Sequence, residues 1–166
     1  MRKALATVGV MGLTCLGLAT PASAAPPQAI HETITFDVSQ GEDAPGQIEA
    51  SGAINGSGIN ETTSSRDTGH ANHSTELQTF DDGTITIKDS SHGTGDQFDP
   101  ETCTDTFSST GPFKVTGGTG AYEGARGHGH ATVNGTVTFA QTADGCNFDE
   151  PPTGTVVVTV NGKVKL

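Results

Sequence analysis

The stretch Phe113-Lys-Val-Thr-Gly-Gly-Thr-Gly-Ala-Tyr-Glu-Gly-Ala-Arg-Gly127 decides the fold. It begins as a short strand, Phe113–Thr116, and continues into two groups of glycines. The first group is Gly117, Gly118 and Gly120, and the second is Gly124 and Gly127, with Gly129 two residues further along. Glycines at this density are typical of positions that need a positive φ angle or a close approach between backbones. The stretch therefore predicts a tight connection between two β-strands.

Period-two alternation of apolar and polar residues recurs along residues 25–166, whereas helical periodicity is absent. The clearest case is Gly129–Phe139, where Ala131, Val133 and Val137 share one face. The eight segments predicted as strands are Thr33–Val38, Gln47–Ile54, Glu76–Phe80, Thr84–Lys88, Cys103–Ser108, Phe113–Thr116, Gly129–Phe139 and Thr153–Val160. The segments predicted as loops are Gly56–Asn72, Ser90–Glu101 and Ala143–Pro152. Asn161-Gly162 is a hairpin-turn signal, so Lys163–Leu166 is expected to fold back.

Eight short antiparallel strands, each with one apolar face, must bury that face against one another. A closed barrel or a two-sheet sandwich does this. Eight strands suit a barrel whose interior is just filled or holds one small ligand. We therefore predict an all-β fold, an eight-stranded antiparallel closed barrel.

Residues 1–24 read as a secretory signal peptide, and residues 25–166 as one β-barrel domain. Arg2 and Lys3 precede an apolar run too short to span a bilayer. Cleavage is expected between Ala24 and Ala25, after a small-x-small pattern. The predicted location is therefore extracellular.

Two cysteines follow the predicted cleavage point, Cys103 and Cys146. In an exported protein a disulfide between them is the expected state, with two free thiols as the alternative. Their spacing includes no metal-binding Cys-x-x-Cys pattern.

The chain is acidic, with a net charge of −11. Loss of residues 1–24 would remove two basic and no acidic residues, which takes the charge to −13. This charge argues against nucleic acid, and against membranes once the signal is removed, as partners. No phosphate loop, dinucleotide fingerprint or nucleophile elbow is present, and no cofactor is predicted.

The segment from Gly117 to Gly127 resembles the glycine hairpin of the allene oxide cyclase-like and dirigent-like barrels. That motif reads Gly-Gly-Thr/Ser-Gly, one variable residue, an aromatic, two variable residues, Ala, one variable residue, Gly. The residues in this chain that match it are Gly117, Gly118, Thr119, Gly120, Tyr122, Ala125 and Gly127. The resemblance implies a calycin-like eight-stranded barrel, in a secreted bacterial member of unassigned activity. The early strands match neither family closely, so their functional residues are not carried over.

Two carboxylates are candidates for catalysis inside such a barrel. Glu32 lies near the start of the first predicted strand, and Asp105 shares a face with Phe107 and Cys103. A carboxyl group in an apolar lumen would have a shifted pKa, which acid–base catalysis exploits. An exposed edge position is the competing interpretation for Asp105.

Four further residues are candidates for binding. Phe107 and Tyr122 are aromatic groups that either contact a ligand or plug the core. His128 and His130 lie two apart on a strand and so share a face, a spacing that can hold Zn²⁺ or Cu²⁺. That face also carries Thr132 and is expected to be exposed, which argues against a metal.

The sequence favours a non-catalytic binder of a small apolar or aromatic ligand or of a partner. The first alternative is a cofactor-free isomerase or cyclase of the allene oxide cyclase type. The second is a structural or interaction module with a plugged barrel, which could form a homo-oligomer. The width and polarity of the lumen separate these alternatives.

Overall fold

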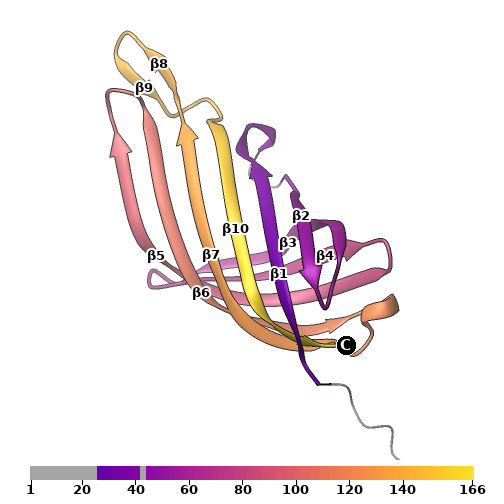
Figure 1. The fold of residues 1–166 in the computed structure, drawn as a ribbon. Coiled ribbons are helices and arrows are strands. Elements are labelled where there is room, and N and C mark those ends of the chain that lie inside the picture. The colour runs from indigo at the N-terminus through magenta and orange to yellow at the C-terminus, as the bar shows by residue number, and fades with distance from the viewer. Residues whose placement is uncertain (1–25, 42–43) are drawn as a thin grey trace, which may run out of the picture.

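A computed structural model describes residues 26–41 and 44–166, and these form a closed, antiparallel, eight-stranded β-barrel (Figure 1). The strands around the barrel follow the order β1-β10-β7-β6-β5-β4-β3-β2. Their bounds are β1 Gln28–Asp37, β2 Gly46–Gly52, β3 Gly56–Asp67, β4 Asn72–Phe80, β5 Gly83–Asp99, β6 Thr104–Gly118, β7 Arg126–Thr138 and β10 Thr153–Lys165. Two short 3₁₀ helices, η1 Val38–Gln40 and η2 Gly120–Tyr122, and a two-stranded hairpin of β8 Ala140–Thr142 and β9 Gly145–Asn147 complete the fold. The predicted fold class is confirmed.

One end of the barrel is filled by apolar side chains, and we call it the packed end. It lies where β1 begins and β6 and β10 finish, since Val164 pairs with both Gln28 and Gly127, and Gly127 pairs with Val115. The buried side chains that fill it are Ile30, Ile48, Ile54, Phe80, Ile85, Val115, Tyr122, Ala125 and Val164. Those that lie on strands come from alternate positions, as a pleated wall with one buried face requires, and Ile54, Tyr122 and Ala125 come from the connections between strands.

The glycine-rich connection between β6 and β7 closes the packed end. Gly120 has φ +63°, and a Cβ there would overlap the carbonyl oxygen of Asp82, so this position requires glycine. The ring of Tyr122 packs edge to face on Phe80, with ring centroids 5.8 Å apart. Gly117 has no such constraint, because a Cβ there would meet only the Arg126 side chain at an ordinary 3.6 Å. The sequence interpretation of this connection is therefore confirmed for most of its glycines.

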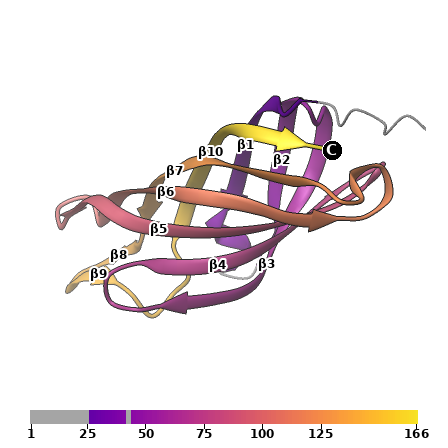
Figure 2. The ribbon, with the colours of Figure 1, turned by 90° about the horizontal axis from the view of Figure 1, so that it is seen from below.

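Beyond the opposite end of the barrel, β5, β6, β7 and β10 continue as a curved extension (Figures 1 and 2). β4 pairs with β5 only as far as Ser91, so residues 92–99 of β5 pair with β6 alone. The hairpin of β8 and β9 lies at the tip of this extension (Figure 1).

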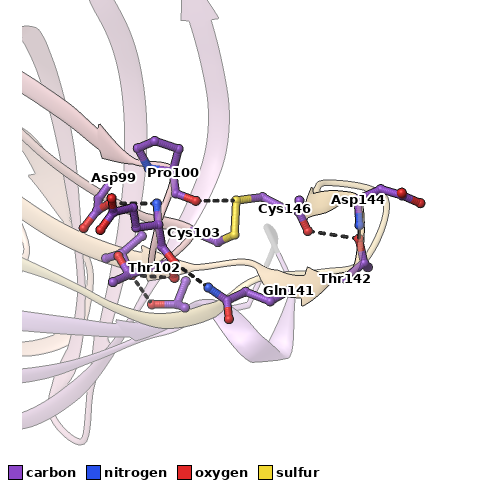
Figure 3. Close-up of a disulfide and its surroundings, with 12 residues drawn as sticks. Asp99, Pro100, Thr102, Cys103, Gln141, Thr142, Asp144 and Cys146 are labelled. Carbon is purple, nitrogen blue, oxygen red and sulfur yellow. Dashed lines mark hydrogen bonds between the residues drawn. A yellow bond between two sulfur atoms is a disulfide. The ribbon is translucent and has the colours of Figure 1, made fainter.

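A disulfide between Cys103 and Cys146 ties β9 to the turn between β5 and β6 (Figure 3). Gln141 adds a side-chain hydrogen bond of 2.7 Å to the backbone oxygen of Glu101, and the Phe139 N–H donates to Cys103 O at 2.9 Å. The predicted disulfide is confirmed.

Two segments predicted as loops are largely strands, and the third, Ala143–Pro152, contains the short strand β9. Gly56–Asn72 contains all of β3, and Ser90–Glu101 contains the outer half of β5. Both are rich in Ser, Thr, Asn and Gly, and the loop prediction followed from that composition. It was wrong because polar residues are compatible with a strand when both of its faces contact water or a polar lumen.

Two other boundaries also differ from the prediction. The segments predicted as Cys103–Ser108 and Phe113–Thr116 belong, apart from Cys103 in the preceding turn, to a single strand, β6, which continues through Ser109-Thr110-Gly111-Pro112. The expected count of eight is right because this merger offsets the missed β3. Asn161-Gly162 is not a turn: β10 passes straight through it, where Asn161 pairs with His31 and His130.

The predicted signal peptide and its cleavage site at Ala24 and Ala25 lie outside the described residues. Within residues 26–41 and 44–166, no helix has the length and hydrophobicity needed to cross a membrane.

Candidate functional site

The barrel interior next to the packed end holds a cavity of about 220 Å³. Two walls of opposite character line it. The polar wall comes from β3, β4 and the middle of β5, and consists of Asn60, Thr62, Ser74, Glu76, Gln78 and Asp89. The apolar wall comes from β1, β5, β6, β7 and β10, and consists of Ile34, Phe36, Ile87, Phe113, Ala131, Val133, Val158 and Val160. The cavity can therefore take a molecule with one polar and one apolar end.

Strand register explains why the polar side chains meet. Ser74, Glu76 and Gln78 occupy alternate positions of β4 and so face the same side. Asn60 on β3 is the direct partner of Gln78, and Asp89 on β5 is the direct partner of Ser74. Side chains at directly opposite positions lie close enough to interact.

Glu76 is the centre of the polar wall. One of its carboxylate oxygens accepts hydrogen bonds from Asn60 Nδ2 at 2.8 Å and from Thr62 Oγ1 at 3.0 Å. The Ser74 hydroxyl lies within hydrogen-bond distance of both Glu76 and Asp89. A serine hydroxyl carries one proton, so it can donate to only one of these two carboxylates at a time.

Glu32 extends the polar wall inward, at the boundary with the packed end. Its inward neighbours along β1 are Ile30 and Ile34, and only 2% of its surface is exposed. Gln78 Nε2 donates to Glu32 Oε2 at 2.7 Å. Gln78 lines the cavity and Glu32 does not, so Glu32 contacts the cavity through Gln78.

Three buried oxygens of this cluster have no protein donor: Glu32 Oε1, Asn60 Oδ1 and Gln78 Oε1. The two amide oxygens are left free because each amide nitrogen already donates to a carboxylate. A buried acceptor without a donor costs about 1–3 kcal/mol. Asn60 and Gln78 line the cavity and Glu32 does not, so a bound donor that reached the free amide oxygens of Asn60 and Gln78 would satisfy them.

Burial also changes how the carboxyl groups titrate. It raises the pKa of Glu32 from 4.5 to about 7, against the opposing hydrogen bond from Gln78. It raises the pKa of Asp89 as well; the Ser74 hydroxyl opposes this shift, and the neighbouring Glu76 charge adds to it. Near neutral pH, Glu32 is therefore a group that can hold or release a proton inside the barrel.

The other carboxylate candidate, Asp105, lies outside the cavity. It is half-buried on the inner face of the extension, where it pairs with Phe98 on β5 and Val137 on β7. Burial raises its pKa, and the neighbouring Asp96 carboxylate raises it further. Asp105 and Glu32 are thus not brought together in one site.

The aromatic and histidine candidates also lie away from the cavity. Phe107 covers Gly135 on β7, and Tyr122 is 5% exposed in the packed end. His128 and His130 are exposed on the outer face of β7, as their register predicted. Over residues 26–41 and 44–166, no group of three or more His, Cys, Asp or Glu side chains is arranged to hold a metal ion.

Sequence reasoning missed Asn60, Glu76, Gln78 and Asp89. Asn60 fell in a segment predicted as a loop, Glu76–Phe80 alternates only weakly, and Asp89 directly follows the predicted strand Thr84–Lys88. A period-two pattern of polar residues, Ser74-x-Glu76-x-Gln78, was the signal that could have identified the polar wall.

Neither protein-family models, nor curated proteins, nor solved structures gave a match to this chain.

Proposed function

We propose that this protein is a binder of one small molecule with an apolar body and a hydrogen-bonding end, which it holds in the barrel cavity. The observation that carries the proposal is the pairing of an apolar wall with buried, unsatisfied acceptors around about 220 Å³. A dry apolar cavity of roughly 150 Å³ holds a benzene-sized molecule. Sites for drug-sized ligands begin near 300 Å³. The cavity therefore suits a ligand of about one ring with a short polar substituent.

The proposal includes secretion through residues 1–24 and a relation to the allene oxide cyclase-like and dirigent-like barrels. The signal-like pattern supports the first, and the glycine connection with Tyr122 and Ala125 supports the second. A mass measurement on protein secreted by a bacterial host that expresses the full chain tests the first. The expected product begins at Ala25, and the native spectrum also counts the copies in each particle. Recovery of residues 1–24 on the secreted protein would contradict cleavage.

Calorimetric titration with 2-phenylethanol tests the binding function. We expect one molecule per barrel, with a dissociation constant of about 1 mM or lower. Val133→Phe should abolish binding because Val133 lines the cavity. Val157→Phe is the matched control, since Val157 alternates with the cavity-lining Val158 and so points to the other face. Equal behaviour of the two variants, or no binding to the unmodified protein, would contradict the proposal.

A second candidate function is a cofactor-free isomerase in which Glu32 exchanges a proton with the ligand. The specific observation in its favour is the buried Glu32 beside Gln78, with a pKa of about 7. A general acid or base works best when its pKa is near the working pH. Against it, Gln78 and not Glu32 lines the cavity. Exchange of a ligand C–H proton for deuterium, lost in Glu32→Gln, would support the enzyme, and its absence would leave the binder.

A further inference from the structure

The polar wall carries two carboxylates, and His73, whose charge lowers the pKa of Asp89, is exposed and does not line the cavity. Glu76 and Asp89 both line the cavity, and Ser74 offers them a single proton. Among the described residues that line the cavity, none is Lys, Arg or His. Two carboxylates in a partly enclosed space repel each other unless a proton or a cation lies with them.

The unpaired oxygens of the polar wall add a second, independent observation. Asn60 and Gln78 are 2% and 1% exposed, line the cavity, and each has a side-chain oxygen without a protein donor. They are direct partners across β3 and β4, and Glu76 is the next inward residue along β4. Amide oxygens and carboxylates thus form one continuous set of acceptors.

We infer that the ligand of the cavity is a cationic amine: an ammonium group that donates to Asn60, Gln78 and the Glu76–Asp89 pair, on an apolar body against Phe113, Val133 and Val158. This inference rests on the proposed function and names the chemical class of its ligand. An ammonium group brings up to three donors and one positive charge, which a hydroxyl group does not. The apolar wall selects an organic amine over a free metal ion, which would have to leave its own hydration shell against Val and Phe. The net charge of −11 favours the approach of a cation.

Three probes with closely similar bodies test the inference: 2-phenylethylamine, 2-phenylethanol and 3-phenylpropanoate, titrated at pH 8 in low salt. We expect the amine to bind about tenfold more tightly than the alcohol, because charge-assisted hydrogen bonds are about twice as strong as neutral ones. We expect no detectable binding of the carboxylate. Equal or tighter binding of the alcohol or the carboxylate would overturn the cationic ligand while leaving the binding function intact. No binding of any probe would overturn both.

Variants locate the selectivity on the polar wall. Glu76→Gln and Asp89→Asn should each bring the amine and the alcohol to within about threefold of each other, since each removes a charge and keeps the shape of the side chain. Glu49→Gln is the matched control, because Glu49 is exposed on the outer face of β2 and its loss changes the total charge equally. Thermal unfolding of each variant establishes that it is folded. If Glu49→Gln removes the preference as strongly as the other two, the preference comes from the total charge and the inference is wrong.

Discussion

The two ends of the barrel interior are both lined by alternate strand positions, but one end is filled by side chains and the other holds a cavity. At the packed end, Ile30, Ile85 and Val164 fill the space between the strands. At the other end of the interior, toward the extension, the inward positions of β3 and β4 carry Asn60, Glu76 and Gln78, and a cavity remains. We call this the hollow end. Polar side chains there keep their hydrogen-bonding groups toward one another, and a collapse of the apolar wall onto them would leave those groups without partners. The difference indicates that polarity on one wall maintains the hollow end.

The largest loss of stability is expected on removal of the disulfide, which holds the tip of the extension and neither end of the interior. Cys103→Ser together with Cys146→Ser should lower the free energy of unfolding by about 4 kcal/mol in the loop-entropy model. Urea unfolding of the variant and the unmodified protein measures this. A loss below about 1 kcal/mol would mean that the hydrogen bonds of Gln141 and Phe139 hold the tip without the disulfide.

Truncation of one apolar side chain at each end compares the stability that the two ends contribute. Ile85→Ala at the packed end should cost about 3 kcal/mol, because Ile85 is fully buried and its removal leaves a new cavity. Val158→Ala at the hollow end should cost roughly 1 kcal/mol, because Val158 is half-buried beside a space that already exists. The same unfolding experiment measures both. Equal losses would contradict the distinction between a packed and a hollow end.

Glu32, which lies at the boundary between the two ends, should make the stability of the fold depend on pH. Its pKa is about 7 in the fold against an ordinary value of 4.5, so the folded protein binds more protons in this window. Stability should therefore fall as the pH rises from about 4.5 to 7, and the loss should be complete above that range. Glu32→Gln keeps the shape of the side chain, keeps an oxygen that can accept from Gln78 Nε2, and removes this titration.

We accordingly expect Glu32→Gln to be more stable than the unmodified protein by about 2 to 3 kcal/mol at pH 8 and nearly equal to it at pH 4.5. Urea unfolding at the two pH values tests this, and the difference between the two proteins removes the contributions of other carboxyl groups. A variant that is less stable at pH 8 would show that the ionised Glu32 is stabilised inside the barrel.

The smallest effect is expected on the outer face, which belongs to neither end of the interior. His128→Ala with His130→Ala should change stability by less than about 0.5 kcal/mol, because both side chains are exposed. It should leave binding of 2-phenylethylamine unchanged. A loss of that binding would place the site on the wrong face of β7.

Sequence reasoning reached the architecture and part of the buried core, including Ile48, Ile85 and Val115, because apolar alternation reports directly which face is buried. Ile30 and Val164 were missed because they lie outside the predicted strands. The Gly118–Gly120 connection and the Cys103–Cys146 pair also follow from local chemistry and from cysteine count. The polar wall of the hollow end was not predicted, because its inward positions are polar and a polar strand such as β3 has the composition of a loop. Glu32 was identified as a carboxylate of interest, whereas its partner Gln78 comes from a strand 46 residues away and only the closed barrel brings them together.

The most direct test of the account is a methyl-resolved NMR titration of the folded protein with 2-phenylethylamine. We predict that methyl signals of Ile34, Ile87, Val133, Val158 and Val160 at the hollow end shift, while those of Ile30, Ile48, Ile85, Val115 and Val164 at the packed end stay in place. Shifts centred on the packed end or on outward methyl groups such as those of Val157 would contradict the claim that a polar wall keeps this part of the barrel open for a ligand.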